Sequence, residues 1–150
     1  INIFLFKKKF TGGTNSQGLS YTKTFYISRH TKVDWINCFS VCENSGLKFA
    51  TIDSITELNG LQDICGRADF AAFGNPYVSG MTFAPGSKDN WYCIQRGDRI
   101  NFSIPWGPGQ PDNWKNVEQC LQLVKSWNCK FNDNPCTGDQ NLCLCQKVIF

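Results

Sequence analysis

The chain has 150 residues, of which 41% are hydrophobic and 18% are charged, so it is predicted to fold as one domain with a single packed core. The formal net charge of +3 is small, which argues against a nucleic-acid-binding protein. No apolar run approaches the roughly 18 residues of a membrane-spanning helix, and the short apolar start does not have the form of a signal peptide. The basic run from Lys7 to Lys9 is interpreted as solvated rather than as a polyanion contact.

Nine cysteines are the strongest compositional feature. Reducing compartments disfavour structural disulfides, so this number predicts a secreted, extracellular protein that several bridges stabilise. A zinc site is disfavoured, because no cysteine pair has zinc-knuckle spacing and the one histidine is His30. The odd number leaves at least one cysteine without a partner in the chain. We therefore expect either a free thiol or a disulfide-linked homodimer or heterodimer.

The first predicted elements are an arm and a strand. Residues 1 to 20 are predicted to be a flexible arm, because Gly12, Gly13 and Asn15 interrupt any regular pattern. The domain is predicted to span residues 21 to 150. Residues 23 to 28, with the sequence Lys-Thr-Phe-Tyr-Ile-Ser, predict the first strand.

Two helices are predicted next, each from a capping box to a glycine. The two boxes are Thr31 with Asp34 and Ser54 with Glu57, and the two glycines are Gly46 and Gly66. Spacings of three and four residues predict the faces that the helices bury. These faces consist of Trp35, Cys38, Phe39 and Cys42 in the first helix, and Leu58, Leu61 and Cys65 in the second.

The second half of the chain predicts short strands and long loops. A short strand is also predicted between the helices, at residues 48 to 52. The later strands are predicted at residues 77–81, 90–95, 119–124, 130–133 and 142–148. A strand, two helices and a largely β half together predict an α+β fold. The segment 104–116 is a long loop, and a long loop inside a compact domain is usually functional.

The loop and its neighbours hold the densest polar group in the chain. It consists of Gln110, Asp112, Glu118, Asn132 and Asp133. Calcium prefers six to eight oxygen ligands, which carboxylates, amides and backbone carbonyls supply. Taken as bare residue types, the same side chains could equally be solvated loop residues.

The arrangement of this group resembles the sugar-binding signature of C-type lectins. The resemblance rests on Gln110-Pro111-Asp112, then Glu118 and Cys120, then Asn132-Asp133 three residues before Cys136. It extends from about Tyr26 to Val148. It implies a C-type lectin-like fold, with two helices packed on small antiparallel sheets and a long calcium-binding loop. It also implies a binding module and not an enzyme; no Ser-His-Asp or Cys-His set is apparent in the sequence.

The family's pattern implies that the five polar residues hold one calcium ion and bind two neighbouring sugar hydroxyls. In family members a cis peptide precedes the proline that corresponds to Pro111. The order of amide before acid, at Gln110 and Asp112, is associated with galactose rather than mannose. Trp114 strengthens this implication, because galactose has an apolar face that can lie on an indole. The alternative is that Trp114 only packs within the loop and does not contact a sugar.

Three departures from the family's pattern bear on these implications. Phe131 stands where a tryptophan is usual, and two extra residues, including Cys129, precede Asn132. Asn113 and Gln119 stand where an auxiliary calcium site has acids, so one calcium is expected and not two.

The resemblance implies two disulfides, Cys42–Cys145 and Cys120–Cys136. A further bridge Cys38–Cys143 would run parallel to the first, because one helical turn and two strand residues both span about 6 Å. Cys38–Cys65 is its competitor and is only slightly less favoured. Cys65, Cys93 and Cys129 are the candidates for the leftover cysteine.

Two further short motifs occur in the sequence. Asn101-Phe102-Ser103 is an N-glycosylation acceptor on an expected hairpin. Arg96-Gly97-Asp98 resembles an integrin-binding tripeptide, but an ordinary glycine turn is the favoured interpretation.

The function expected from the sequence is calcium-dependent binding of terminal galactose-type sugars, for recognition of foreign or cell-surface glycans in innate immunity. The alternative is an interaction protein on the same fold that binds a protein surface as a disulfide-linked oligomer.

Overall fold

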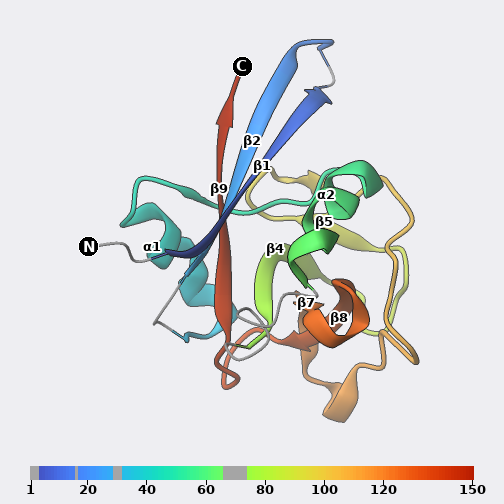
Figure 1. The fold of residues 1–150 in the computed structure, drawn as a ribbon. Helices are drawn as coiled ribbons and strands as arrows, with labels where there is room; N and C mark the ends of the chain where they lie inside the picture. Colours follow the sequence, from blue (N-terminus) through green and yellow to red (C-terminus); the bar gives the residue numbers. More distant parts are fainter. Residues whose placement is uncertain (1–3, 16, 29–31, 66–73) are drawn as a thin grey trace.

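The computed structural model describes residues 4–15, 17–28, 32–65 and 74–150. Its elements give an α+β fold, as predicted (Figure 1). The helices are α1 Cys38–Glu43 and α2 Ile55–Cys65, with short 3-10 helices η1 Trp35–Asn37, η2 Trp114–Asn116 and η3 Lys125–Trp127. The strands are β1 Phe4–Thr14, β2 Ser20–Ser28, β3 Lys48–Phe49, β4 Pro76–Thr82, β5 Trp91–Cys93, β6 Asp98–Arg99, β7 Glu118–Val124, β8 Lys130–Pro135 and β9 Leu142–Ile149.

The strands form two regions that meet at β9. In the first region β9 pairs antiparallel with β2 and β3, and β2 pairs with β1. In the second region β4 pairs with β5 and β7, and β7 pairs with β8. A parallel contact between β4 and β9 joins the regions, so the strand that ends the described chain lies at the centre of the fold (Figure 1).

Residues 4–14 form a strand where the sequence analysis predicted a flexible arm. This strand, β1, makes a hairpin with β2 that projects beyond the body of the protein (Figure 1). Asn15 shapes the turn, because its side-chain oxygen accepts hydrogen bonds from the backbone nitrogens of Gln17 and Leu19 at 3.0 and 2.9 Å. A Cβ atom on Gly13 would lie 2.2 Å from the Tyr21 ring, so glycine permits this close approach. The glycines therefore lie within β1, where its register with β2 shifts between Phe10 and Gly13, and the strand continues through them.

The first helix begins differently from its prediction. Asp34 precedes η1 without a side-chain cap, and its carboxylate instead accepts a hydrogen bond from the backbone nitrogen of Gly138 at 3.1 Å. The predicted capping box is therefore wrong as regards Asp34, while Thr31 and His30 lie outside the described residues. Trp35 is buried as predicted, and its indole nitrogen donates to the carbonyl of Val78 at 2.8 Å.

The second helix agrees closely with its prediction. The Ser54 hydroxyl accepts a hydrogen bond from the backbone nitrogen of Glu57 at 3.1 Å. The Glu57 carboxylate accepts from the backbone nitrogen of Asp53, one residue earlier than a standard capping box. The predicted inner face is buried, and it consists of Leu58, Leu61 and Cys65. Gly66 lies outside the described residues.

Four disulfides stabilise the fold, and three of them connect a helix to the β half. The bridges Cys38–Cys143 and Cys42–Cys145 run side by side from α1 to β9, with Cα atoms 5.5 Å apart in both. The other two are Cys120–Cys136 and Cys65–Cys129. The alternative bridge Cys38–Cys65 is therefore wrong. Closing a loop of about 100 residues stabilises a fold by about 4–5 kcal/mol in the chain-entropy model. Because the two α1–β9 bridges close almost the same loop, the second adds less.

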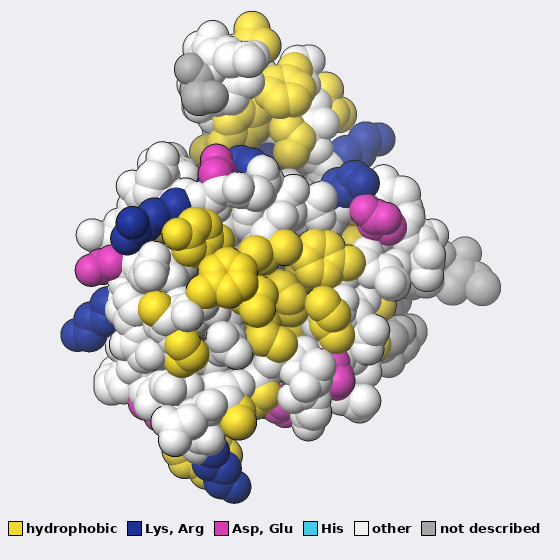
Figure 2. Space-filling model, turned by 180° about the vertical axis from the view of Figure 1, so that it is seen from behind, with side chains coloured by type: hydrophobic (Ala, Val, Ile, Leu, Met, Phe, Trp, Pro, Cys, Tyr) yellow, Lys and Arg dark blue, Asp and Glu magenta, His cyan; other side chains and the backbone are white. Residues whose placement is uncertain are grey.

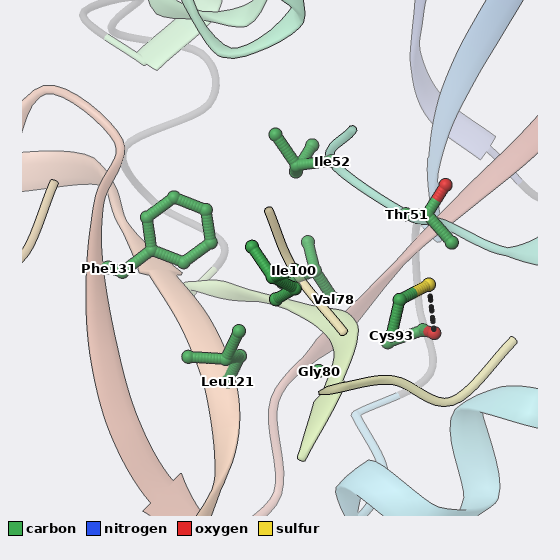
Figure 3. Close-up of a pocket in the computed structure, with 9 residues that line it drawn as sticks. Thr51, Ile52, Val78, Gly80, Cys93, Ile100, Leu121 and Phe131 are labelled. Carbon is green, nitrogen blue, oxygen red and sulfur yellow. Dashed lines mark hydrogen bonds between the residues drawn. The ribbon is translucent and has the colours of Figure 1, made fainter. Parts of the chain in front are cut away.

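Cys93 is the cysteine left without a disulfide. It is 2% exposed and lies beside a cavity of about 10 Å³, which is about the room of one water molecule (Figure 3). Its sulfur lies 3.9 Å from the Ser79 hydroxyl, and burial raises the pKa of the thiol. The expected covalent dimer therefore has no accessible thiol in the folded protein. No helix among the described residues is both long and apolar enough to cross a membrane.

Candidate functional site

The long loop between β6 and β7 is anchored to β8 at its base. The backbone nitrogen of Phe131 donates to the carbonyl of Pro105 at 3.0 Å, and the backbone nitrogen of Gly107 donates back to Phe131 at 2.9 Å. The Trp106 ring packs against Trp91 and Phe131, with centroids 5.3 and 6.4 Å apart. Phe131 is 1% exposed, so the phenyl group fills the core where a tryptophan is usual. This pairing brings residues 110–118 beside Asn132 and Asp133.

The loop then follows an unusual backbone path. The peptide bond between Gln110 and Pro111 is cis. Asn113, Lys115 and Asn116 have φ angles of 47°, 56° and 59°, which non-glycine residues seldom adopt. Asparagine tolerates this left-handed conformation better than most residues do.

Three carboxylates converge where this loop meets the two strands. Asp112, Glu118 and Asp133 each place an oxygen within 4.8 Å of the other two. Asp133 is fully buried, and its two oxygens accept hydrogen bonds from the backbone nitrogens of Asp112 and Asn113 at 3.2 and 2.7 Å. Glu118 is 6% exposed and accepts from the backbone nitrogen of Trp114 at 2.9 Å. The loop backbone therefore orients both buried acids.

Two amides complete the group. The side-chain oxygen of Gln110 is buried and has no hydrogen-bond partner. The side-chain nitrogen of Asn132 donates to the Gln122 side chain at 3.1 Å, which leaves the amide oxygen of Asn132 for another contact. A buried acceptor without a donor costs free energy unless a ligand or an ion satisfies it.

The electrostatics indicate that the group favours added positive charge. Burial raises the pKa of Glu118 to about 7, with further contributions from a hydrogen bond to Asp112 and from the charge of Asp133. Burial also raises the pKa of Asp133. Ionised acids this close repel one another, and a cation would relieve that repulsion. All the donors are oxygens, so the residues fit a hard divalent cation such as calcium and not a soft metal.

An open hollow of about 320 Å³ lies over this group. Trp114, which is 60% exposed, and the half-buried Trp127 contribute aromatic surface to it. The ammonium of Lys115 lies 4.3 Å from the centre of the Trp114 ring. The hollow thus combines oxygen ligands with apolar ring surface, a combination suited to a ligand with hydroxyl groups and C–H faces.

The structure brings together all six residues that the sequence analysis assigned to the metal and the sugar. These are Gln110, Asp112, Trp114, Glu118, Asn132 and Asp133. Trp127, which also lines the hollow, was not among the residues expected from the sequence. The signal that could have found it is a tryptophan five residues before Asn132.

The two residues that stand where an auxiliary site would have acids make hydrogen bonds within the protein. The Asn113 side-chain oxygen accepts from the backbone nitrogen of Glu118 at 3.2 Å. The Gln119 side-chain nitrogen donates to the carbonyl of Thr82 at the same distance. In the described part of the chain, the acids of the long loop, β7 and β8 form the one group of three or more potential metal ligands.

The two short motifs lie apart from this site. Asn101 is exposed, as a glycosylation acceptor must be. Arg96 forms ion pairs with Asp53 and with Asp98 of its own tripeptide, in the turn between β5 and β6. The two charges of the tripeptide are therefore engaged with each other, which favours the interpretation as an ordinary turn.

The sequence and the fold were compared with those of known proteins. No sequence-family model matches the chain. C-type lectin domain family 4 member K of Mus musculus is 29% identical over 122 residues, which cover 77% of the chain and 33% of the relative. The chain thus spans about a third of the length of that relative.

Solved structures show the same fold at lower identity. The carbohydrate-recognition domain of the mouse scavenger receptor C-type lectin aligns with a TM-score of 0.64 at 23% identity, over 83% of this chain and 87% of that one. A calcium-independent type II antifreeze protein aligns with a TM-score of 0.62 at 23% identity, over 85% of this chain and 88% of that one. This fold is one of non-enzymatic binding domains. With its two helices, its mixed sheet and its four disulfides, the chain has the C-type lectin-like fold.

Proposed function

We propose that the domain binds terminal galactose-type sugars on glycans through one calcium ion. The observation that carries the proposal is the convergence of three carboxylates beside the unpartnered Gln110 oxygen. The residues that would hold the ion are Gln110, Asp112, Glu118, Asn132 and Asp133. Calcium bound there would supply coordination positions for sugar hydroxyls.

The side chains divide the hydrogen bonds of each sugar hydroxyl between them. A carboxylate accepts the hydroxyl proton, and an amide nitrogen donates to the hydroxyl oxygen. Asn132 already uses one amide hydrogen on Gln122, so its second hydrogen is the one that it offers. Gln110 supplies the amide and Asp112 the acid on either side of Pro111, and this order supports galactose rather than mannose.

Trp114 supports the same sugar class. Its ring is 60% exposed beside the ligand group, and the Lys115 ammonium lies over the ring. The apolar face of galactose can lie on this ring and lose its contact with water. The site is open and shallow, so its affinity for one sugar should be weak, on the order of 0.1–1 mM. Recognition of a cell surface would then need several sites acting together.

The comparisons limit what the fold alone supports. The fold occurs in a named lectin domain and also in a protein described as calcium-independent. The calcium proposal therefore rests on the ligand residues of this chain. The disulfides support an extracellular location, where calcium is abundant and the bridges are stable.

Retention on immobilised galactose tests the proposal. We expect the protein to be retained in calcium and released by a chelator or by free galactose. Asp112→Asn should abolish retention, because it removes one of the three carboxylates. Asp89→Asn is the matched control, since it removes an exposed acid outside the site. Equal retention of the two variants would contradict the proposed site.

A protein-binding role is the second candidate. One face of the molecule carries a group of hydrophobic side chains with few charges at its centre (Figure 2). Surfaces of this kind often contact protein partners. Because Cys93 is buried, such a role would not use a disulfide-linked oligomer of the folded domain. Retention by a glycoprotein that neither a chelator nor free sugar reverses would favour this candidate.

A further inference from the structure

Trp127 lines the same hollow as the proposed sugar ligands, yet the proposed function does not use it. It belongs to η3, in the connection between β7 and β8, whereas Trp114 belongs to the long loop. Trp127 is half-buried, so part of its ring faces the hollow and part packs on the protein. The hollow therefore has aromatic surface from two separate connections.

The position of the Trp127 ring is determined by Gly107. A Cβ atom on Gly107 would lie 2.2 Å from the ring, so the indole packs directly on the loop backbone there. The backbone nitrogen of Gln110 donates to the carbonyl of Gly107 at 3.1 Å, which closes a tight turn. The ring therefore lies one turn before Gln110, and Trp114 follows Gln110 by four residues. Along the loop, the two indoles flank the Gln110–Asp112 ligand segment.

The connection that carries Trp127 is also held firmly. The bridge from Cys129 to Cys65 ties it to α2. The backbone nitrogens of Asn128 and Cys129 donate to Lys125 and Val124 at 3.1 and 3.0 Å. Ordering a side chain before binding lowers the entropic cost of binding. Trp127 is thus a preorganised ring surface at the edge of the site.

We infer that Trp127 forms a second subsite, which stacks on the sugar residue linked to the galactose-type sugar in the first. The inference rests on the proposed function. Trp114 supplies a stacking surface for the first sugar, so the separate surface of Trp127 is available to the next pyranose ring. The ligand of the whole hollow is then a galactose-terminated disaccharide or longer glycan. An aromatic contact of this kind strengthens binding by about threefold to tenfold.

Calorimetry with methyl β-galactoside and lactose, in calcium, tests the subsite. We expect wild-type protein to bind lactose about threefold to tenfold more tightly than methyl β-galactoside. Trp127→Ala should remove this preference and leave the affinity for methyl β-galactoside unchanged. Trp127→Phe should retain part of it. Trp114→Ala is the contrasting variant and should lower the affinity for both sugars.

Gly107→Ala provides an independent route to the same result. Its methyl group would displace the Trp127 ring while the tryptophan is kept. It should therefore remove the lactose preference as Trp127→Ala does. Calcium affinity, measured without sugar, should be unchanged in both variants, and this measurement reports whether the loop is intact.

The outcomes separate the inference from the proposed function. If wild-type protein binds neither sugar, both fail. If it binds both sugars equally and Trp127→Ala alters neither, the proposed function stands and the subsite is overturned. Equal weakening of both sugars by Trp127→Ala would also overturn it, because Trp127 would then act on the first sugar. If wild-type protein instead prefers N-acetylgalactosamine and Trp127→Ala loses that preference, the Trp127 ring contacts a substituent of the first sugar. That result would overturn the assignment of Trp127 to a second sugar residue.

Discussion

Asp133 on β8 accepts a hydrogen bond from the backbone nitrogen of Asn113, 20 residues earlier in the chain, at 2.7 Å. A second bond, from the backbone nitrogen of Asp112, reaches the other oxygen of the same carboxylate. One fully buried acid thus positions the loop and belongs to the proposed ligand set. Loop order and metal binding should consequently be linked.

Replacing Asp133 with Asn tests this link. The amide offers one oxygen to the loop in place of two, so one backbone nitrogen loses its partner. We expect the free energy of unfolding in a chelator to fall by about 1–3 kcal/mol. Calcium binding should be lost as well, because the charge is removed. Thermal unfolding and calcium titration measure the two effects, and an intact calcium affinity would contradict the ligand assignment.

Calcium itself should stabilise the domain. The ion binds residues that only the folded chain brings together, so saturation shifts the folding equilibrium by mass action. At a free calcium concentration 100 times the Kd, the gain is about 2.7 kcal/mol. The melting temperature should rise accordingly in wild-type protein and not in Asp112→Asn. An unchanged melting curve after chelation at neutral pH would argue that the site is empty.

The acids of the site predict that the stability of the calcium-free protein falls, and that its calcium affinity rises, as pH increases. The pKa of Glu118 is raised to about 7 in the folded state, from a reference value of 4.5. The folded state therefore holds this proton more tightly than the unfolded state. In a chelator, stability from Glu118 should be full below about pH 4.5 and should be lost as pH rises to about 7. Calcium affinity should increase over the same range, because the ion replaces the proton.

Glu118→Gln isolates this effect. It removes the titrating group and keeps a side chain of similar size, so the slope of melting temperature against pH in a chelator should become smaller. Measurements at several values between pH 4.5 and 7.5 provide the comparison. An identical slope in wild-type and variant would exclude Glu118 as its source.

The order of amide and acid predicts the sugar preference. The double variant Gln110→Glu and Asp112→Asn exchanges donor and acceptor around Pro111 and keeps the net charge of the ligand set. We expect it to keep calcium and to shift preference from galactose toward mannose. Competition with free monosaccharides on a glycan surface measures the shift. If mannose inhibits the wild-type protein more strongly than galactose does, the proposed specificity is wrong.

The burial of Cys93 predicts a monomer in non-reducing electrophoresis. The thiol is 2% exposed and burial raises its pKa, so it should resist alkylation in the folded protein. After denaturation without reductant, one cysteine should react. The Cys93→Ser variant should also migrate as a monomer, and it should have no cysteine that reacts after denaturation. A disulfide-linked dimer of the wild-type protein that is absent in Cys93→Ser would show that β5 opens and exposes the thiol.

The sequence alone determined the features that depend on local spacing. The Ser54 cap follows from residues within one helical turn. The resemblance implies Cys42–Cys145, and the matching spacings of the two cysteine pairs then slightly favour Cys38–Cys143 over Cys38–Cys65. Such patterns can be read locally, because one helical turn and two strand residues have fixed lengths. The resemblance carried by Gln110-Pro111-Asp112 likewise depends on residue order along the chain.

The tertiary structure decided what depends on distant partners. Residues 4–14 become a strand because β2 offers them a pairing edge, although their glycines indicate a flexible arm locally. Cys129 pairs with Cys65 across a sequence separation of 64 residues, which leaves Cys93 buried and alone. Trp127 joins the site only because Gly107 admits its ring against the loop. Contacts between segments far apart in the chain arise from packing and backbone pairing, and no local pattern encodes which segments will meet.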